Sequence, residues 1–111
     1  MATDEEILVE MKKLLEQLTS KKFAKHFKTW NKTMQYHFTD TDDYWYIKLV
    51  NGQPENPVKG KVEKPEISYQ MTTTDYLALM HGEVKGLKLY NQGKLKIKAT
   101  MPDILKLQKL N

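Results

Sequence analysis

The sequence predicts an α+β fold, in which helices cover one face of a single sheet and solvent meets the other face. Two patterns carry this prediction. Apolar residues recur at helical spacing towards both ends of the chain, and they alternate with polar residues in segments between. The chain has 111 residues without a repeat or a linker, so we expect one domain over residues 1–111.

The first helix is predicted from Thr3 to about Thr19. Thr3 is a suitable N-cap, and Glu6 three residues later completes a capping box. One apolar face then follows at three- and four-residue spacing, formed by Ile7, Leu8, Met11, Leu14, Leu15 and Leu18.

A second, shorter helix is predicted over residues 21–30, with Phe23, Phe27 and Trp30 on one face and lysines mostly away from it. Two interpretations of this face stay open. It is either part of the core beneath a solvated lysine face, which is the more common case, or the wall of a cavity whose lysines meet an anionic surface.

From Thr33 the apolar period changes to two, which predicts strands. The first strand covers residues 33–39, and the second ends at Asn51-Gly52, a pair that favours a tight turn. A short edge strand is expected over residues 58–62, where lysines guard the edge. A fourth strand presents Ile67, Tyr69 and Met71 on one face.

The C-terminal third combines short helices with a last strand. A helix is expected over residues 72–82, and a weaker helical pattern covers residues 85–91. Residues 94–98 alternate strictly and turn three lysines to water. The final helix begins near Thr100, because Pro102 suits the first turn of a helix.

The charge of the chain limits its partners. The net charge is +4, and all 18 residues counted as lysine or arginine are lysine. Arginine is the usual residue for bidentate contacts to phosphate and guanine, so we expect no specific nucleic-acid partner. The positive field can still attract an anionic membrane surface transiently. The absence of cysteine excludes disulfides and thiolate metal sites.

No group of residues matches a catalytic or metal-binding motif. His26, His37 and His81 do not pair at zinc-helix spacing, and residues 40–43 lack the pattern of a calcium loop. We therefore expect a binding module that is not an enzyme and uses no cofactor or metal. The acidic N-terminus, the lack of a long apolar run and the lack of a peroxisomal C-terminus predict a cytoplasmic protein, and nothing indicates more than a monomer.

Large, soft side chains are abundant, with six methionines, six tyrosines, three phenylalanines and two tryptophans. Methionine fits irregular spaces, so this set is compatible with an apolar cavity lined from several elements. Each such residue taken alone is better explained as core filling, and composition does not separate a packed core from a hollow one.

Several motifs occur together from Ile67 to Leu110. A strand ending at Met71 is followed by Asp75-Tyr76-Leu77-Ala78-Leu79-Met80 with Gly82, and then by Gln92-Gly93-Lys94-Leu95-Lys96-Ile97. Earlier in the chain stand Trp45, Leu49 and Asn51-Gly52. In these motifs the chain resembles the sterol carrier protein 2 family, the non-specific lipid-transfer proteins. Asn91, Pro102 and Asp103 depart from the family pattern near the expected end of its tunnel.

The resemblance implies a five-stranded sheet in the order 3-2-1-4-5, with an apolar tunnel between the sheet and the helices. The ligand would be a fatty acid, a fatty acyl-CoA, a phospholipid or a sterol-like lipid. By position, the tunnel would be lined by Phe23, Phe27, Trp30, Phe38, Trp45, Ile47, Met71, Leu77, Met80, Leu87, Tyr90, Ile97, Ile104 and Leu107. Gln92 and Gln108 would be polar contacts for the head group.

The expected function is therefore non-catalytic binding and carriage of a lipid. The alternative is a protein-interaction or accessory domain of the same fold without an open cavity, which assists a lipid- or quinone-metabolising enzyme.

Overall fold

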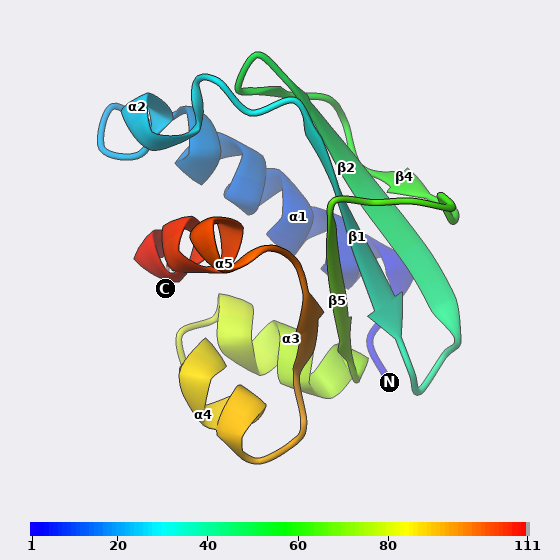
Figure 1. Cartoon of the computed structure of the whole chain (residues 1–111). Helices are drawn as coiled ribbons and strands as arrows, with labels where there is room; N and C mark the ends of the chain where they lie inside the picture. The colour runs from blue at the N-terminus through cyan, green and yellow to red at the C-terminus, as the bar shows by residue number, and fades with distance from the viewer. Residues whose placement is uncertain (111) are drawn as a thin grey trace.

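Figure 1 shows the computed structural model, which describes residues 1–110. Within these residues, five helices occupy Asp4–Thr19 (α1), Ala24–Phe27 (α2), Thr73–Met80 (α3), Gly86–Asn91 (α4) and Met101–Leu107 (α5), and a short 3-10 helix, η1, follows at Gln108–Leu110. The same residues hold six strands, at Lys32–Phe38 (β1), Asp43–Val50 (β2), Gln53–Pro54 (β3), Val58–Lys59 (β4), Ile67–Met71 (β5) and Lys96–Lys98 (β6).

The strands form one mixed sheet in the order β3-β2-β1-β5-β6, and the short β4 also pairs with β2. β1 runs parallel to β5, whereas the other pairs are antiparallel. The α+β class is confirmed, and β2, β1, β5 and β6 follow one another as expected for predicted strands 2, 1, 4 and 5. The expected count of five strands is wrong, because two short strands, β3 and β4, both pair with β2 where one third strand was expected. The helices lie on one side of the sheet, while the segment from β4 to β5 passes across β1 and β2 (Figure 1).

The edge strand predicted over residues 58–62 is shorter than expected, and the edge is divided. β3 and β4 are two residues long, and each pairs with a different part of β2. Proline has no amide hydrogen to donate, so Pro54 and Pro57 prevent one continuous ladder along this edge.

The predicted helix over residues 21–30 is wrong in extent, because α2 has only four residues. No side chain caps its first turn at Phe23, and that turn holds no acidic residue, so only backbone bonds such as that from the Ala24 amide to the Ser20 carbonyl at 2.8 Å support it. α2 contributes the buried Phe27, whose ring meets Trp30 edge to face with 4.9 Å between the ring centroids. The core interpretation of this face is therefore the one that the structure supports.

The long helix α1 begins as predicted. The Glu6 amide donates to Thr3 Oγ1 at 3.2 Å, and the Thr3 amide donates to Glu6 Oε1 at 3.0 Å. These two bonds complete the capping box. The Thr3 amide lowers the pKa of the Glu6 carboxyl most, followed by the Thr3 hydroxyl, which donates to Glu6 Oε1 at 3.2 Å.

The core lies between the sheet and α1. Along β1, Met34, Tyr36 and Phe38 are buried, and they face the same layer as Ile47 of β2. The apolar face of α1 covers this layer with buried side chains at Ile7, Met11, Leu14 and Leu18. The alternating apolar face of the strands and the apolar face of the helix therefore pack against each other on one side of the sheet, as expected.

A hydrogen-bonded group joins the N-terminus, the β1–β2 turn and the start of α3. Thr73 donates to Asp40 through its amide at 2.9 Å and through its hydroxyl at 2.5 Å, and the Ala2 amide donates to Thr73 Oγ1 at 3.0 Å. Desolvation opposes ionisation of Asp40, but the two bonds from Thr73 outweigh it and lower the pKa of the carboxyl below 3.8.

Replacing Asp40 by asparagine removes the charge that accepts both bonds. We expect a loss of about 1 kcal/mol in the free energy of unfolding at neutral pH, a small value because Asp40 is exposed and water screens it. Because the pKa of Asp40 is lowered on folding, the carboxylate stabilises the folded state fully at pH values above the ordinary pKa of 3.8. This stabilisation is lost as the pH falls through the lowered pKa. Urea denaturation of the wild type and D40N at neutral and acid pH measures the difference in the free energy of unfolding. A difference that persisted in strong acid would show that the charge is not the cause.

The turn after β2 makes a close backbone contact. Gly52 has a φ of +77°, and a Cβ at this position would lie 2.5 Å from Lys28 Cα and 2.7 Å from the Phe27 carbonyl oxygen. The Gly52 amide donates to the Trp30 carbonyl at 2.9 Å. Both the backbone angle and the space therefore require glycine here.

Replacing Gly52 by alanine should destabilise the fold by about 2–4 kcal/mol, because overpacking adds to the strain of a positive φ. Gly82 supplies a matched control, since its φ of +76° is similar but a Cβ there would meet nothing within 4 Å. G82A should cost only about 1–2 kcal/mol. Thermal and urea denaturation of G52A and G82A measure the stability that each variant loses. Equal losses of stability would show that the close contact at Gly52 is not a cause.

Candidate functional site

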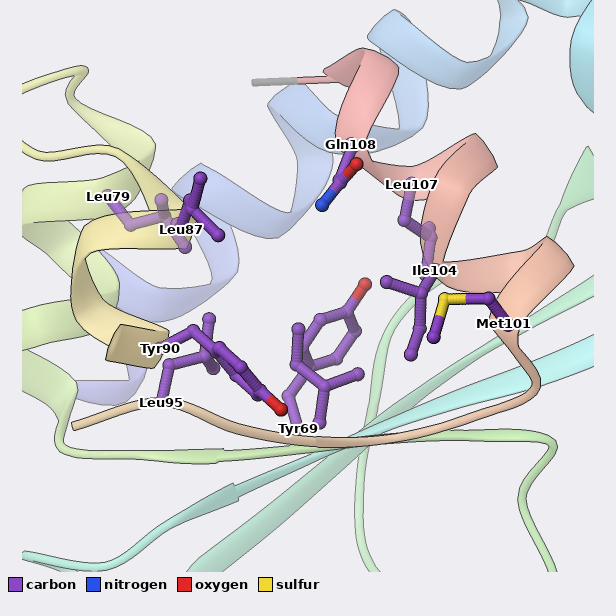
Figure 2. A pocket seen from close by; sticks show the side chains of 11 residues that line it. Tyr69, Leu79, Leu87, Tyr90, Leu95, Met101, Ile104, Leu107 and Gln108 are labelled. Carbon is purple, nitrogen blue, oxygen red and sulfur yellow. The ribbon is translucent and has the colours of Figure 1, made fainter. Parts of the chain in front are cut away.

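An apolar cavity of about 250 Å³ lies between the β5–β6 edge of the sheet and helices α3, α4 and α5 (Figure 2). Eleven residues line it: Tyr69, Leu79, Gly86, Leu87, Tyr90, Leu95, Ile97, Met101, Ile104, Leu107 and Gln108. Most of these side chains are apolar, so the cavity suits a ligand that is mainly hydrocarbon.

Local periodicity directs these side chains to a common space. Leu87 and Tyr90 are three residues apart on α4, and Met101 and Ile104 have the same spacing on α5. Ile97 faces inward from β6, directly opposite Tyr69 of β5. Figure 2 shows the α4 and α5 side chains on opposite sides of the cavity, with Tyr69 between them.

The cavity opens to solvent between α4 and α5. Three of its lining residues remain largely exposed, with exposed fractions of 61% for Leu87, 54% for Tyr90 and 65% for Met101. The neighbouring Leu105, outside the lining, is 56% exposed. Large apolar side chains that both line a cavity and meet solvent mark its mouth.

A second, deeper space of about 100 Å³ adjoins the first. Its walls come from α1, α3, the sheet and the C-terminal end: Leu14, Gln17, Met34, Tyr36, Tyr69, Met71, Tyr76, Leu79, Met80, Leu107 and Leu110. Tyr69, Leu79 and Leu107 line both spaces, so these three side chains separate them.

Two polar groups point into the larger cavity. Figure 2 shows the Tyr69 hydroxyl and the Gln108 amide directed towards its centre. Burial raises the pKa of Tyr69 well above 10, and the neighbouring Tyr36, whose ring stacks on it with 4.8 Å between the centroids, raises it further. The Tyr69 hydroxyl therefore stays protonated at neutral pH and can donate a hydrogen bond to a ligand.

The structure brings about half of the predicted tunnel residues together. Six line the larger cavity: Leu87, Tyr90, Ile97, Ile104, Leu107 and Gln108. Two more, Met71 and Met80, line the deeper space. The remaining eight line neither space: Phe23, Phe27, Trp30, Phe38, Trp45, Ile47, Leu77 and Gln92. Seven of these are core or core-packed side chains, whereas Gln92 is exposed, and ligand contact by any of the eight stays a prediction.

Sequence reasoning also missed several lining residues. Tyr69 alternates with Ser68 and Gln70 on β5, so its place on the covered face was readable from the pattern. Met101 had no such signal, because it stands at the first position of α5, before the apolar stripe begins. Met34 and Tyr36 lie on the alternating face of the first predicted strand, and both are buried core residues as well as walls of the deeper space.

A partly buried ion pair holds α5 against β1. Lys32 Nζ lies 2.6 Å from Asp103 Oδ2, and the Asp103 residue is only 5% exposed. The Lys32 ammonium also lies 5.2 Å from the centroid of the Trp30 ring. Because Ile104 and Leu107 of α5 form one wall of the cavity, this pair fixes the position of that wall.

Replacing Asp103 by asparagine keeps its shape and leaves Lys32 without a carboxylate partner. We expect a loss of about 1–3 kcal/mol in stability and faster amide hydrogen exchange along α5. The control is D4N, which removes an exposed ion pair between Asp4 and Lys59 and should cost under about 1 kcal/mol. Unchanged exchange in α5 of D103N would show that the pair does not hold the wall.

No helix within residues 1–110 is long and apolar enough to cross a membrane. In the same part of the chain, no three side chains among histidine, aspartate and glutamate come together as a metal site would require.

This architecture, an α+β domain with an apolar cavity between its sheet and its helices, is that of a small lipid-carrier domain. The match to the SCP-2 sterol transfer family spans residues 11–111, and the chain belongs to that family. The comparison with curated protein sequences gives no match.

Solved structures share the fold at low sequence identity. The sterol carrier protein domain 2 of Helicoverpa armigera has a TM-score of 0.78 at 21% identity, over 98% of this chain and 89% of that one. Palmitated SCP2L2 from Aedes aegypti has a TM-score of 0.71 at 14% identity, over 98% and 94%. The UbiJ-SCP2 ubiquinone synthesis protein has a TM-score of 0.65 at 9% identity, over 99% and 92%.

The fold also occurs inside an enzyme. The sec-alkylsulfatase Pisa1 from Pseudomonas sp. matches with a TM-score of 0.60 at 16% identity, over 71% of this chain. This chain spans only 12% of the sulfatase. Carrier proteins of the SCP-2 family are generally non-catalytic.

Proposed function

We propose that this protein binds and carries a lipid with a long apolar chain in the cavity between β5–β6 and α3–α5, without chemical conversion of the lipid. The observation that carries the proposal is an apolar cavity that stays open through the exposed side chains of Leu87, Tyr90 and Met101. Membership of a sterol-transfer family and the shared fold of a palmitated relative support it.

Burial of the hydrocarbon supplies the binding energy. Each methylene removed from water contributes roughly 0.8 kcal/mol, so a sixteen-carbon chain gains about 10 kcal/mol before the costs of ordering it. Ligand pockets usually hold about 300–1,000 Å³. The larger space of about 250 Å³ is slightly below this range, so a full chain needs the deeper space of about 100 Å³ as well. Rotation of Tyr69, Leu79 or Leu107 would join the two, which together form the proposed tunnel.

The head group would remain near the polar side chains. The protonated Tyr69 hydroxyl and the Gln108 amide both reach into the cavity and suit the oxygen of a carboxylate, ester or alcohol. These groups fit a fatty acid, fatty acyl-CoA, phospholipid or sterol-like ligand alike. Their number is small, as in other apolar pockets that bind by shape and fix orientation with few hydrogen bonds.

Loading and release would take place at a membrane surface. The apolar residues at the mouth can enter the interface of a bilayer, and Lys85 and Lys88 at α4 can meet anionic head groups. Lys106 of α5 lies over the Trp30 ring instead, with its Nζ 5.9 Å from the ring centroid. The contact would be transient, because a few lysines contribute only about 1 kcal/mol each near the surface.

We expect Leu107→Glu to abolish binding of a fluorescent fatty acid, because it places a carboxylate where the two spaces meet. Since L107E could unfold the protein, Ile104→Trp provides a second test that fills the larger cavity with an apolar ring. I104W should weaken palmitate binding by roughly ten-fold or more. The control is L105E, on the same helix but outside the lining and already exposed. Wild-type affinity in folded I104W and L107E would contradict the proposal.

The alternative, an accessory domain of a lipid- or quinone-metabolising enzyme, is supported by the shared fold of the ubiquinone synthesis protein. Native mass spectrometry of the freshly purified protein, followed by solvent extraction, separates the two. A co-purifying mass that extracts as a lipid supports carriage. A clean apo mass with no uptake of added palmitate or palmitoyl-CoA supports the accessory role.

A further inference from the structure

The face of the sheet opposite the helices carries a polar cleft of about 280 Å³. Three lysines, Lys61, Lys96 and Lys98, line it together with the hydroxyl and amide side chains of Ser68 and Gln70. No acidic side chain is part of the lining. The cleft thus carries charged side chains, which the lining of the cavity on the covered face lacks.

Strand register places the polar side chains in two rows. Across β1, β5 and β6 the rows are Gln35–Ser68–Lys98 and His37–Gln70–Lys96. Because alternate residues of a strand share a face, both rows point away from the helices. The inward residues between them, Tyr69 and Ile97, border both the cleft and the apolar cavity, so one strand pair separates the two.

The third lysine is brought in by the segment between β4 and β5, which crosses the strands in Figure 1. The Val62 amide in this segment donates to Gln35 Oε1 at 2.7 Å, which ties the segment to the sheet. Lys61 Nζ consequently lies 4.8 Å from the centroid of the Tyr44 ring, at the side of the cleft.

The three ammonium groups keep their charge available. Within residues 1–110, none of them forms an ion pair with a carboxylate. Two carboxylates near the cleft have other partners, since Asp42 contacts Nε2 of His37, a lining residue, at 2.8 Å and Glu66 accepts from the Thr33 amide at 2.6 Å. A concave surface with one sign of charge concentrates the opposite ion.

We propose that this cleft binds a phosphate group, carried either by a soluble phosphate ester or by the head group of a membrane lipid. Three lysines provide point charges for a dianion, and the Ser68 hydroxyl and the Gln70 amide add neutral donors. An apolar ligand does not suit the cleft, because it would desolvate the lysines without pairing them. The site is distinct from the lipid cavity and does not depend on it.

The test is a titration of isotope-labelled protein with glycerol phosphate, followed by amide chemical shifts, with sodium chloride at equal ionic strength as the reference. We expect saturable shifts at Gln35, Ser68, Gln70, Lys96 and Lys98. In K96E/K98E, and separately in K61E, affinity should fall roughly ten-fold or more, as expected for a lost charge-assisted hydrogen bond. The control is K21E/K25E, which lies in the exposed region around α2 and changes the net charge as much as K96E/K98E does. It should bind glycerol phosphate with the affinity of the wild type.

Co-sedimentation with phosphatidylcholine vesicles, with and without phosphatidic acid, distinguishes the two sources. Saturable binding of glycerol phosphate, without vesicle binding that needs phosphatidic acid, assigns the site to soluble esters. Vesicle binding that needs phosphatidic acid, and that is lost in K96E/K98E but kept in K21E/K25E, assigns the site to lipid head groups, whether or not free glycerol phosphate also binds. The proposal is overturned if the shifts do not saturate and no such vesicle binding occurs. It is also overturned if K21E/K25E loses as much binding as K96E/K98E. Palmitate binding should be unchanged in K96E/K98E, which also verifies that the variant is folded.

Discussion

The parallel pairing of β1 with β5 is the interaction on which the rest of the structure depends. It joins an N-terminal half, made of α1, α2 and the β1–β2 hairpin, to a C-terminal half that carries α3, α4, β6 and α5. The pair runs from Met34 opposite Ile67 to Phe38 opposite Met71. Side-chain and backbone hydrogen bonds close both ends, from the Thr33 amide to Glu66 and from the Thr39 amide to the Met71 carbonyl. Since the pairing sets the face on which every strand residue lies, a slip of one residue would exchange the two faces.

The two halves cover the same face of this sheet in different ways. α1 has 16 residues and one continuous apolar stripe, so it fills the space over β1 and β2. α3, α4 and α5 have eight, six and seven residues, and each brings only one or two turns of side chains to the layer. Short helices leave space between their ends, and the cavity lies there. The ion pair of Lys32 with Asp103 holds α5 in place above it.

A single strand pair then separates two chemical environments. Tyr69 and Ile97 face the apolar cavity, while their neighbours Gln70, Lys96 and Lys98 face the polar cleft. The proposed lipid site and the proposed phosphate site are therefore opposite sides of the same short ladder. Independent substitution of inward and outward residues can test them separately, because alternate residues share few contacts across the sheet.

Local signals in the sequence were enough for the elements whose causes are local. The capping box of Thr3 and Glu6, the alternation of Met34, Tyr36 and Phe38, and the placement of Ile97 inward between two lysines each depend on a few neighbouring residues. The resemblance of the C-terminal motifs to a known family supplied the strand order, which no local pattern contains. The sheet edge is divided because Pro54 and Pro57 have no amide hydrogen for a continuous ladder. α2 is shorter than its apolar pattern predicts, and no side chain caps it.

The tertiary structure alone decided which apolar residues fill the core and which line a cavity. Phe27, Trp30 and Trp45 have the same inward pattern as Ile97 and Ile104, yet the first three are packed and the last two face open space. Periodicity reports the face on which a side chain lies, and that is a local property. A cavity depends on how the volumes of side chains from distant elements add up between the sheet and the helices, so it exists only once those elements have come together.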